Sequence, residues 1–193
     1  MRIAILLCAV CGALTGIALW IGARRATPQP PTPQTILRRS RCPGGMAPEA
    51  WRAWVRSCYN AKISPNRITQ TIGDSEHSVG YHHQDGWVRS GAIWLPYSAA
   101  TDIHCAGLDN DAIARLLRAM GKQGFAAWYR HGPKWAGNEH IHAVYALLPM
   151  KPQLIMQVQH FFDQQRRLGN RVRWRHKCKR RYVNAHSSYY GPR

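Results

Sequence analysis

The chemistry of this sequence centres on Glu139-His140-Ile141-His142, in which one residue separates two histidines. On a β-strand, alternate side chains point to the same face, so His140 and His142 would lie side by side. Glu139 would reach that face where the strand begins or bends. Two imidazoles on one face suit a metal site or proton transfer. The plainer interpretation is an edge strand with two surface histidines, and residue types alone favour neither.

A second strand pattern, Asp102-Ile103-His104, again places two chemically active side chains on one face. Upstream, a polar loop offers the adjacent His82 and His83. A catalytic zinc takes three protein ligands of N and O type and keeps one position open. One loop histidine, Asp102 and one histidine of the later strand would supply that set, with Glu139 as a carboxylate base.

The elements that must position these residues show helical and strand patterns in turn. Asp109 begins the clearest helix as a capping residue, and Gly121 ends it. Residues 73–87 are interpreted as a polar loop with Asp85 in a turn. The spacing of apolar residues predicts helices over 46–58, 109–120 and 151–168, and strands over 67–72, 98–103, 125–130 and 140–147. The sequence therefore predicts an α+β fold, a small, mainly antiparallel sheet with packed helices.

Two segments carry a family resemblance. Ala99-Ala100-Thr101-Asp102-Ile103 is similar to the AxDI part of the pattern HxxGxAxDI, and Glu139-His140-Ile141-His142 satisfies both ExxH and HxH. Residues 66–165 thereby resemble the zinc peptidases of the D-alanyl-D-alanine carboxypeptidase type, whose fold is shared with the Hedgehog signalling domain. The resemblance implies a Hedgehog/DD-peptidase-like fold. It also implies an exported zinc metallopeptidase, of D,D-carboxypeptidase or endopeptidase type, that hydrolyses peptide bonds in peptidoglycan stem peptides.

The resemblance also implies roles for six residues. His82, Asp102 and His142 would bind Zn²⁺, Glu139 would be the general base, His140 would stabilise the oxyanion or position substrate, and Arg67 would bind a substrate carboxylate. The family places its first histidine closer to its aspartate, so residues from about 85 to 96 would form an inserted hairpin here. His83 is the alternative to His82, and His104 is either an extra ligand or a neighbour of the ligands.

An apolar segment without charge, residues 3–23, opens the chain. It is long enough to cross a hydrocarbon core of about 30 Å. Residues 1–25 are therefore predicted to be a cleaved signal peptide or a lasting transmembrane anchor. The Pro-rich residues 26–40 are expected to form an extended linker. The peptidase-like domain, residues 41–168, would then lie in the periplasm or cell envelope, either free or anchored in the inner membrane.

The cysteines outside the apolar run are even in number, which suits disulfides in an oxidising compartment. They are Cys42, Cys58, Cys105 and Cys178. We expect a Cys42–Cys58 pair, because these residues are close in sequence and flank a predicted helix, and a Cys105–Cys178 pair. The alternative is four buried thiols. No CxxC occurs beyond the apolar run, which disfavours a structural zinc ribbon.

The charge balance is strongly basic, with a net charge of +18 from 27 Lys and Arg against 9 Asp and Glu. The C-terminal tail, residues 169–193, is basic and contains no acid. Such a tail favours adhesion to a polyanion: a nucleic acid, an anionic membrane or a cell-wall polymer. Because an exported protein rarely meets nucleic acid, the wall or membrane surface is the preferred partner.

Two rival functions use the same residues. His140-Ile141-His142 also resembles the His-hydrophobic-His signature of single-strand DNA nickases, which bind a metal through both histidines and attack with a tyrosine. The basic charge suits DNA, but the export segment does not, and His82 and Asp102 would have no role. The other rival is a non-catalytic, zinc-binding module of the same fold that associates with the wall.

Overall fold

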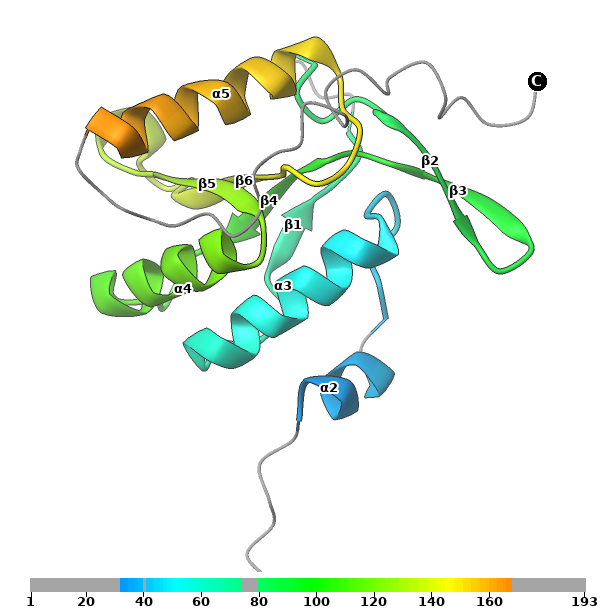
Figure 1. The fold of residues 1–193 in the computed structure, drawn as a ribbon. Coiled ribbons are helices and arrows are strands. Elements are labelled where there is room, and N and C mark those ends of the chain that lie inside the picture. The colour runs from blue at the N-terminus through cyan, green and yellow to red at the C-terminus, as the bar shows by residue number, and fades with distance from the viewer. Residues whose placement is uncertain (1–31, 40, 74–79, 168–193) are drawn as a thin grey trace, which may run out of the picture. The chain divides into compact units, whose positions relative to one another are not determined.

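The structure, a computed structural model, describes residues 32–39, 41–73 and 80–167, all within a unit that begins at Thr32. Its four-stranded sheet has the order β1-β4-β6-β5, and every neighbouring pair is antiparallel. The strands are β1 (Ile68–Gln70), β4 (Ala100–His104), β5 (Phe125–Arg130) and β6 (His140–Tyr145), and the main helices are α3 (Pro48–Ala61), α4 (Asn110–Lys122) and α5 (Pro152–Arg167). Helices α3 and α4 cover one face of the sheet and α5 the other (Figure 1). The predicted α+β class is confirmed.

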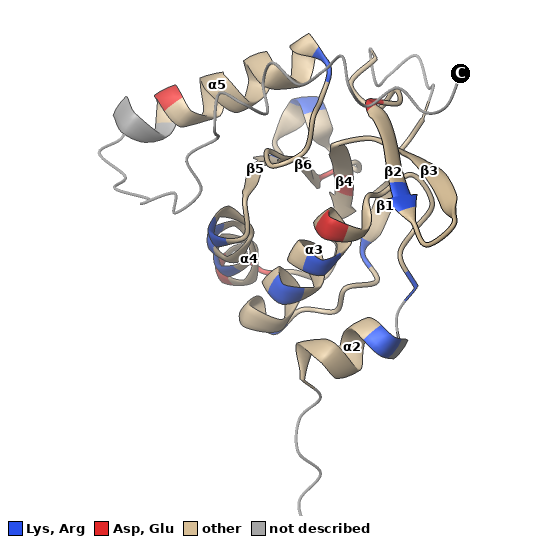
Figure 2. Cartoon of the chain, turned by 45° about the vertical axis from the view of Figure 1, so that its right-hand side comes forward, with Lys and Arg blue, Asp and Glu red and all other residues tan. Residues whose placement is uncertain are grey.

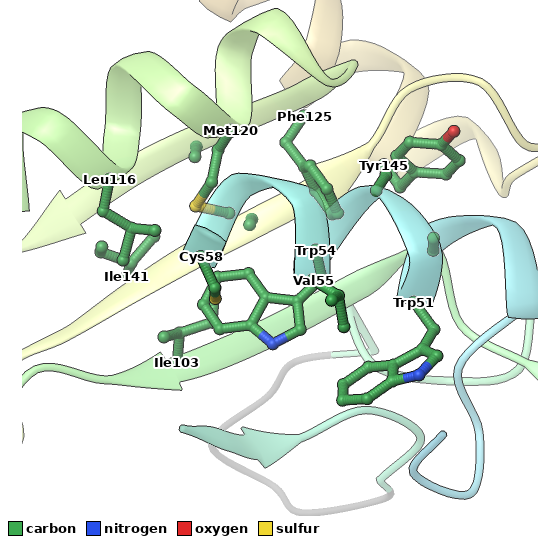
Figure 3. Packing of buried hydrophobic residues seen from close by; sticks show 14 of the residues in the cluster. Trp51, Trp54, Val55, Cys58, Ile103, Leu116, Met120, Phe125, Ile141 and Tyr145 are labelled. Atoms are coloured by element: carbon green, nitrogen blue, oxygen red, sulfur yellow. The ribbon is translucent and has the colours of Figure 1, made fainter. Parts of the chain in front are cut away.

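Strand alternation separates the two faces of the sheet. Ile103 and Ile141 point towards α3 and α4, where they join the larger core, which Figure 3 shows closely packed. Ala126 and Val144 point the other way and pack with Leu154 of α5. Burial of each large apolar side chain contributes about 1.5–3 kcal/mol. Asp102 and His142 alternate in step with Ala100 and Val144 along the same two strands. Their side chains therefore lie on the face of the sheet that α5 covers.

The core is centred on α3, whose apolar residues recur every three or four positions. Trp51, Trp54, Val55 and Cys58 are all buried, and Trp54 has no exposed surface. The indole Nε1 of Trp54 donates a hydrogen bond of 2.9 Å to the carbonyl of Pro65, so the ring buries no unpaired donor. The helix predicted over 46–58 is confirmed and continues to Ala61.

Helix α4 begins as the sequence predicts, but it continues through Gly121 to Lys122, so the expected end at Gly121 is wrong. The Asp109 side chain accepts a 2.6 Å hydrogen bond from the backbone N–H of Ala112, which satisfies one of the free donors of the first turn. Ile113, Leu116 and Met120 are buried against the sheet and α3. The strand after it, β5, has the predicted bounds.

The prediction of an extended linker over 26–40 is wrong for the second half of that range, where residues Pro33–Arg39 form helix α2. Thr32 caps this helix: its Oγ1 accepts a 3.3 Å hydrogen bond from the backbone N–H three residues on, and proline follows at the first helical position. Ile36 and Leu37 then pack against the core beside α3. The local signals for a helix start outweigh the Pro-rich composition.

Several predictions concern residues that the structure does not describe. The apolar run 3–23, the rest of the linker up to residue 31 and the basic tail 169–193 all lie outside the described residues. Within the described ranges, no helix combines the length and apolarity that a bilayer crossing requires. Export, anchoring and adhesion through the tail therefore stay predictions.

The inserted hairpin expected over about 85–96 is present. Strands β2 (Gly86–Ser90) and β3 (Ile93–Tyr97) pair antiparallel as a separate two-stranded sheet, and the hairpin projects from the rest of the unit (Figure 1). At its base, the Tyr97 hydroxyl donates a 2.9 Å hydrogen bond to the carbonyl of Pro149. The hairpin takes up most of the chain between His82 and Asp102.

Asp85 is more than the turn residue that the sequence suggests. Its carboxylate is fully buried. One oxygen accepts a 2.7 Å hydrogen bond from the N–H of Ala99, and the other accepts from the backbone N–H and the ammonium of Lys151, at 2.8 and 2.9 Å. Asp85 therefore joins the loop that carries His82 to the start of β4 and to the start of α5.

The disulfide expected between Cys42 and Cys58 is absent. Cys42, Cys58 and Cys105 are free thiols in the structure, and Cys178 lies outside the described residues. The Cys42 Sγ points to the carbonyl of Met46, at 3.4 Å, whereas Cys58 is buried in the core on the inner face of α3. Closeness in sequence does not bring the two side chains together, because the helix presents Cys58 to the sheet.

Candidate metal centre

Three predicted ligands, His82, Asp102 and His142, come together in one buried group. In the register of β4 and β6, Asp102 lies directly opposite His142, so both side chains share a face. His82 comes from the turn that follows Gly80 and is 2% exposed. One ligand atom from each residue lies within 4.8 Å of the other two, so the group could hold a metal ion.

The carboxylate of Asp102 lies between the two imidazoles. Its Oδ1 is 2.8 Å from Nδ1 of His142, and its Oδ2 is 3.2 Å from Nε2 of His82. Ligand atoms around a tetrahedral zinc, with bonds of about 2.0–2.1 Å, lie about 3.3 Å apart. The separation between Asp102 and His82 is close to that value, whereas the 2.8 Å between Asp102 and His142 is a hydrogen-bond distance that would lengthen around a metal.

The remaining nitrogen of each imidazole faces an oxygen. Nδ1 of His82 lies 2.8 Å from the carbonyl of Thr71, and Nε2 of His142 lies 3.1 Å from Oε1 of Gln157. A carbonyl oxygen only accepts, so Nδ1 of His82 carries a proton. In neutral His82 the lone pair of Nε2 then points at a carboxylate oxygen. Either a proton on Nε2, which makes an ion pair with Asp102, or a metal ion relieves this repulsion. Metal-bound histidines commonly donate their other N–H to an oxygen, as His82 does to Thr71.

The electrostatics of the group keep Asp102 in its charged form. Burial would raise the pKa of Asp102, but hydrogen bonds from His142 and His82, with the charges of these rings, outweigh burial and hold the pKa well below its usual range. Burial lowers the pKa of His142, which outweighs its hydrogen bond to Asp102. The carboxylate is therefore ionised, and without a metal ion it accepts hydrogen bonds from the two rings, whose protons on these nitrogens a metal would replace.

Glu139 and His140 lie beside this group. Both line a cavity of about 580 Å³ that Asp102 also lines. Nδ1 of His140 lies 2.7 Å from the carbonyl of Asn138, so the lone pair of neutral His140 is on Nε2. That Nε2 is buried without a hydrogen-bond partner, 4.0 Å from Oδ1 of Asp102. Glu139 is half-buried just before β6, where strand alternation does not force it to the opposite face.

The alternatives to these ligands lie outside the group. His83 is exposed, whereas its neighbour His82 is buried. His104 is also exposed and lines the 580 Å³ cavity without joining the three ligands. Arg67 donates hydrogen bonds of 3.3 and 3.0 Å to the carbonyls of His104 and Ala106, which fixes it to the end of β4. Its expected role in substrate binding stays a prediction.

Sequence reasoning missed the residues that support His142. Gln157 of α5 contacts Nε2 of the ring, Trp128 stacks on it at a centroid distance of 5.9 Å, and Tyr81 meets its edge at 6.2 Å. Gln157 precedes Val158 on a helix whose buried face includes Leu154. The sequence signal that could have indicated Gln157 is a polar residue at the border of the buried face of a predicted helix. Trp128 is opposite His142 in the sheet register.

The surface away from the site is basic. Figure 2 shows Lys and Arg along α3 and α4, on the face of the sheet opposite to α5. The exposed basic residues on these helices are Arg52, Arg56, Arg115, Arg118 and Lys122. They add to the positive charge that the sequence places in the tail, so a polyanion could contact the unit through either region.

Comparisons with protein-family models, curated proteins and solved structures find no match to this chain. The resemblance to zinc peptidases therefore rests on the sequence segments around Asp102 and Glu139 alone. What the site can do has to be argued from its own donor atoms. These are two imidazoles and one carboxylate in a buried group, with a second carboxylate and a third imidazole on the adjoining cavity.

Proposed function

We propose that this protein is an exported zinc metallopeptidase that hydrolyses peptide bonds in peptidoglycan stem peptides. The observation that carries the proposal is the buried group of His82, Asp102 and His142 beside a cavity lined by Glu139. Two imidazoles and one carboxylate are a ligand set of catalytic zinc, which needs three protein ligands and an open position. The Hedgehog/DD-peptidase-like fold and the choice of zinc are part of this proposal.

The residues around the site have distinct roles in this mechanism. Zinc, when bound, polarises the scissile carbonyl and acidifies water to a pKa of about 7. Glu139 takes the proton from the attacking water and passes it to the leaving amine. His140, which turns its Nε2 towards Asp102 from the same cavity, hydrogen-bonds the developing oxyanion in its protonated form.

Two oxygen atoms outside the group keep the two histidine rings in place. The Thr71 carbonyl holds the His82 ring, and the Gln157 amide holds the His142 ring. With a metal bound, each ring would donate its other N–H to one of these oxygens, which would fix the nitrogen that remains for the metal. The burial of His82 and His142 limits water around the ligand atoms and strengthens their interaction with a cation.

The cell-wall substrate follows from the family resemblance together with the predicted export segment and the basic charge. An anionic wall polymer or membrane surface would hold the enzyme through its tail, and the exposed basic residues of α3 and α4 would add to that attraction. Such binding weakens as the ionic strength rises, because salt screens exposed charges beyond about 10 Å at 0.1 M.

A non-catalytic zinc-binding module is the second candidate. It retains the three ligands and needs no role for Glu139. The cavity beside the three ligands, which Glu139 and His140 line, argues for the enzyme, because a structural zinc site needs no space for a substrate. Hydrolysis with Glu139 as the essential base separates the two candidates.

The test is hydrolysis of purified muropeptides by the full-length, zinc-loaded protein, with products identified by mass spectrometry. We expect cleavage by the wild type and a 10²- to 10⁴-fold lower rate, on the order of a lost general base, in Glu139→Gln, with zinc still bound. Glu49→Gln on the surface of α3 makes the same chemical change away from the site and should leave the rate unchanged. Zinc binding without any cleavage would support the non-catalytic module instead.

A further inference from the structure

The hairpin of β2 and β3 ends in an exposed apolar tip. Ile93 is 59% exposed and Trp94 is 44% exposed, and Gly91 and Ala92 beside them are exposed as well. Among the large apolar side chains that are exposed in the described part of the chain, Ile93 and Trp94 are the only neighbours in sequence. Single exposed apolar residues are ordinary, whereas a group of them at a projecting tip indicates a contact surface (Figure 1).

The hairpin holds this tip away from the core. Both strands are paired along their whole length. Gly91 begins the two-residue turn with a φ of 62°, the conformation that a type II′ turn requires at this position and that glycine adopts freely. At the base, Tyr97 is buried and Val88 packs against the larger core. The tip is therefore presented on a paired, anchored ribbon, and little ordering is needed when it makes a contact.

Apolar side chains lie on both faces of the tip. Consecutive residues of a strand point to opposite faces, so Ile93 and Trp94 do so here. Trp87 lies on the same face as Trp94, and neither ring belongs to a core cluster of the described residues. A protein or a glycan that covered one face would leave the other in water. A lipid bilayer surrounds an inserted tip on every side, so it fits this distribution better.

The charge of the hairpin suits an anionic lipid surface. Residues 86–97 contain one cation, Arg89, and no Asp or Glu. Arg89 is exposed and lies opposite Trp94, two residues before Gly91. At about 3.3 Å per residue it is about 7 Å behind the turn, which matches the depth of about 5–10 Å to which interfacial segments enter a bilayer. At that depth a long Arg side chain reaches the lipid phosphates, and Trp favours the same region.

We propose that the tip of this hairpin inserts into the surface of an anionic bilayer, with Ile93 and Trp94 among the upper acyl chains and Arg89 on the lipid phosphates. The contact differs from the adhesion expected of the basic tail, because it is made by another segment and depends on apolar burial. It would hold the unit at a membrane even where residues 1–25 have been removed. The inference does not rest on the proposed peptidase function.

The experiment measures the fluorescence of Trp94 in the full-length protein bound to vesicles of phosphatidylglycerol and phosphatidylcholine in equal parts. The phosphatidylcholine is either unmodified or brominated near the headgroup end of its acyl chains. Bromine quenches only rings that it contacts, so the predicted anchor does not confuse the result. The emission of Trp94 is the difference between the wild type and Trp94→Phe, which keeps the tip apolar. We expect severalfold quenching of Trp94 and none of Trp135, whose emission is obtained in the same way from Trp135→Phe.

Three variants test which side chains drive insertion. Ile93→Ser should lower the ratio of inserted to free tips about 10-fold, since a large apolar side chain no longer enters the lipid. Met156→Ser is the matched control, because Met156 is 60% exposed but lies on α5, and it should leave the ratio unchanged. Arg89→Gln should lower the ratio about 5-fold with phosphatidylglycerol and leave it unchanged in phosphatidylcholine alone, as expected for one cation near an anionic surface.

Three results would overturn the insertion: no quenching of Trp94, equal quenching of Trp94 and Trp135, or quenching of Trp94 that Ile93→Ser leaves unchanged. Dimerisation that Ile93→Ser abolishes, without quenching by lipid, would identify a second copy of the chain as the occupant instead. Peptide cleavage takes no part in the measurement. Failure of the peptidase test and failure of the insertion are therefore distinguishable.

Discussion

Replacement of Asp85 by alanine should destabilise the fold by about 3 kcal/mol. Removing one partner of a buried ion pair costs about 3–5 kcal/mol, because the other charge is left uncompensated. Lys151 is 14% exposed and also donates a hydrogen bond to the carbonyl of His83, so part of its charge stays solvated and the lower end of that range applies. Two backbone N–H groups, of Ala99 and Lys151, lose their acceptor as well.

The assay is urea unfolding of the full-length, metal-free protein, followed by circular dichroism. With a slope of about 1–3 kcal/mol per molar urea, a loss of 3 kcal/mol moves the midpoint down by about 1–3 M. Asp109→Ala is the matched control, because that aspartate also accepts a backbone N–H but is exposed, and loss of its cap costs about 1 kcal/mol. If Asp85→Ala costs no more than Asp109→Ala, the account of Asp85 as a buried anchor is refuted.

Three further predictions concern the core, the thiols and the support of the metal site. Trp54→Ala should lower the free energy of unfolding by about 3–5 kcal/mol, since the indole is fully buried, and a loss below 1 kcal/mol in the same urea assay would contradict the packing. Burial raises the pKa of Cys42 to about 11, which leaves about 0.1% thiolate at pH 8. Native Cys42 should therefore react with iodoacetamide over 100-fold more slowly than an ordinary cysteine, as mass spectrometry would show, and labelling at the ordinary rate would disprove its burial. Gln157→Ala should weaken zinc binding about 10- to 100-fold in a chelator competition, whereas the exposed Gln159→Ala should not, and equal affinities would remove Gln157 from the site.

Much of the fold was predictable because the helices and strands have strong local patterns. The alternation around His142 and the cap at Asp109 depend only on neighbouring residues, and the structure places both as expected. The hairpin between His82 and Asp102 was expected from another source, the shorter spacing that the resembled family has at this point, and β2 and β3 form it. The choice of His82 over His83 agrees with the burial of the first and the exposure of the second.

The remaining features depend on contacts between distant parts of the chain. Asp85 resembles a turn residue locally, and only its approach to Lys151 shows that it is a buried anchor. Cys42 and Cys58 are near in sequence, but α3 turns Cys58 into the core. Gln157 has no recognisable motif, because its contact with His142 arises only where α5 packs beside β6.

The most direct test of the metal centre is the zinc content and affinity of the full-length protein and three variants. The account predicts one tightly bound zinc in the wild type, lost in both Asp102→Ala and His142→Ala. His83→Ala, which removes an exposed histidine next to His82, should keep it. A wild type without zinc, or zinc binding that survives Asp102→Ala, would contradict the assignment of His82, Asp102 and His142 as the ligands.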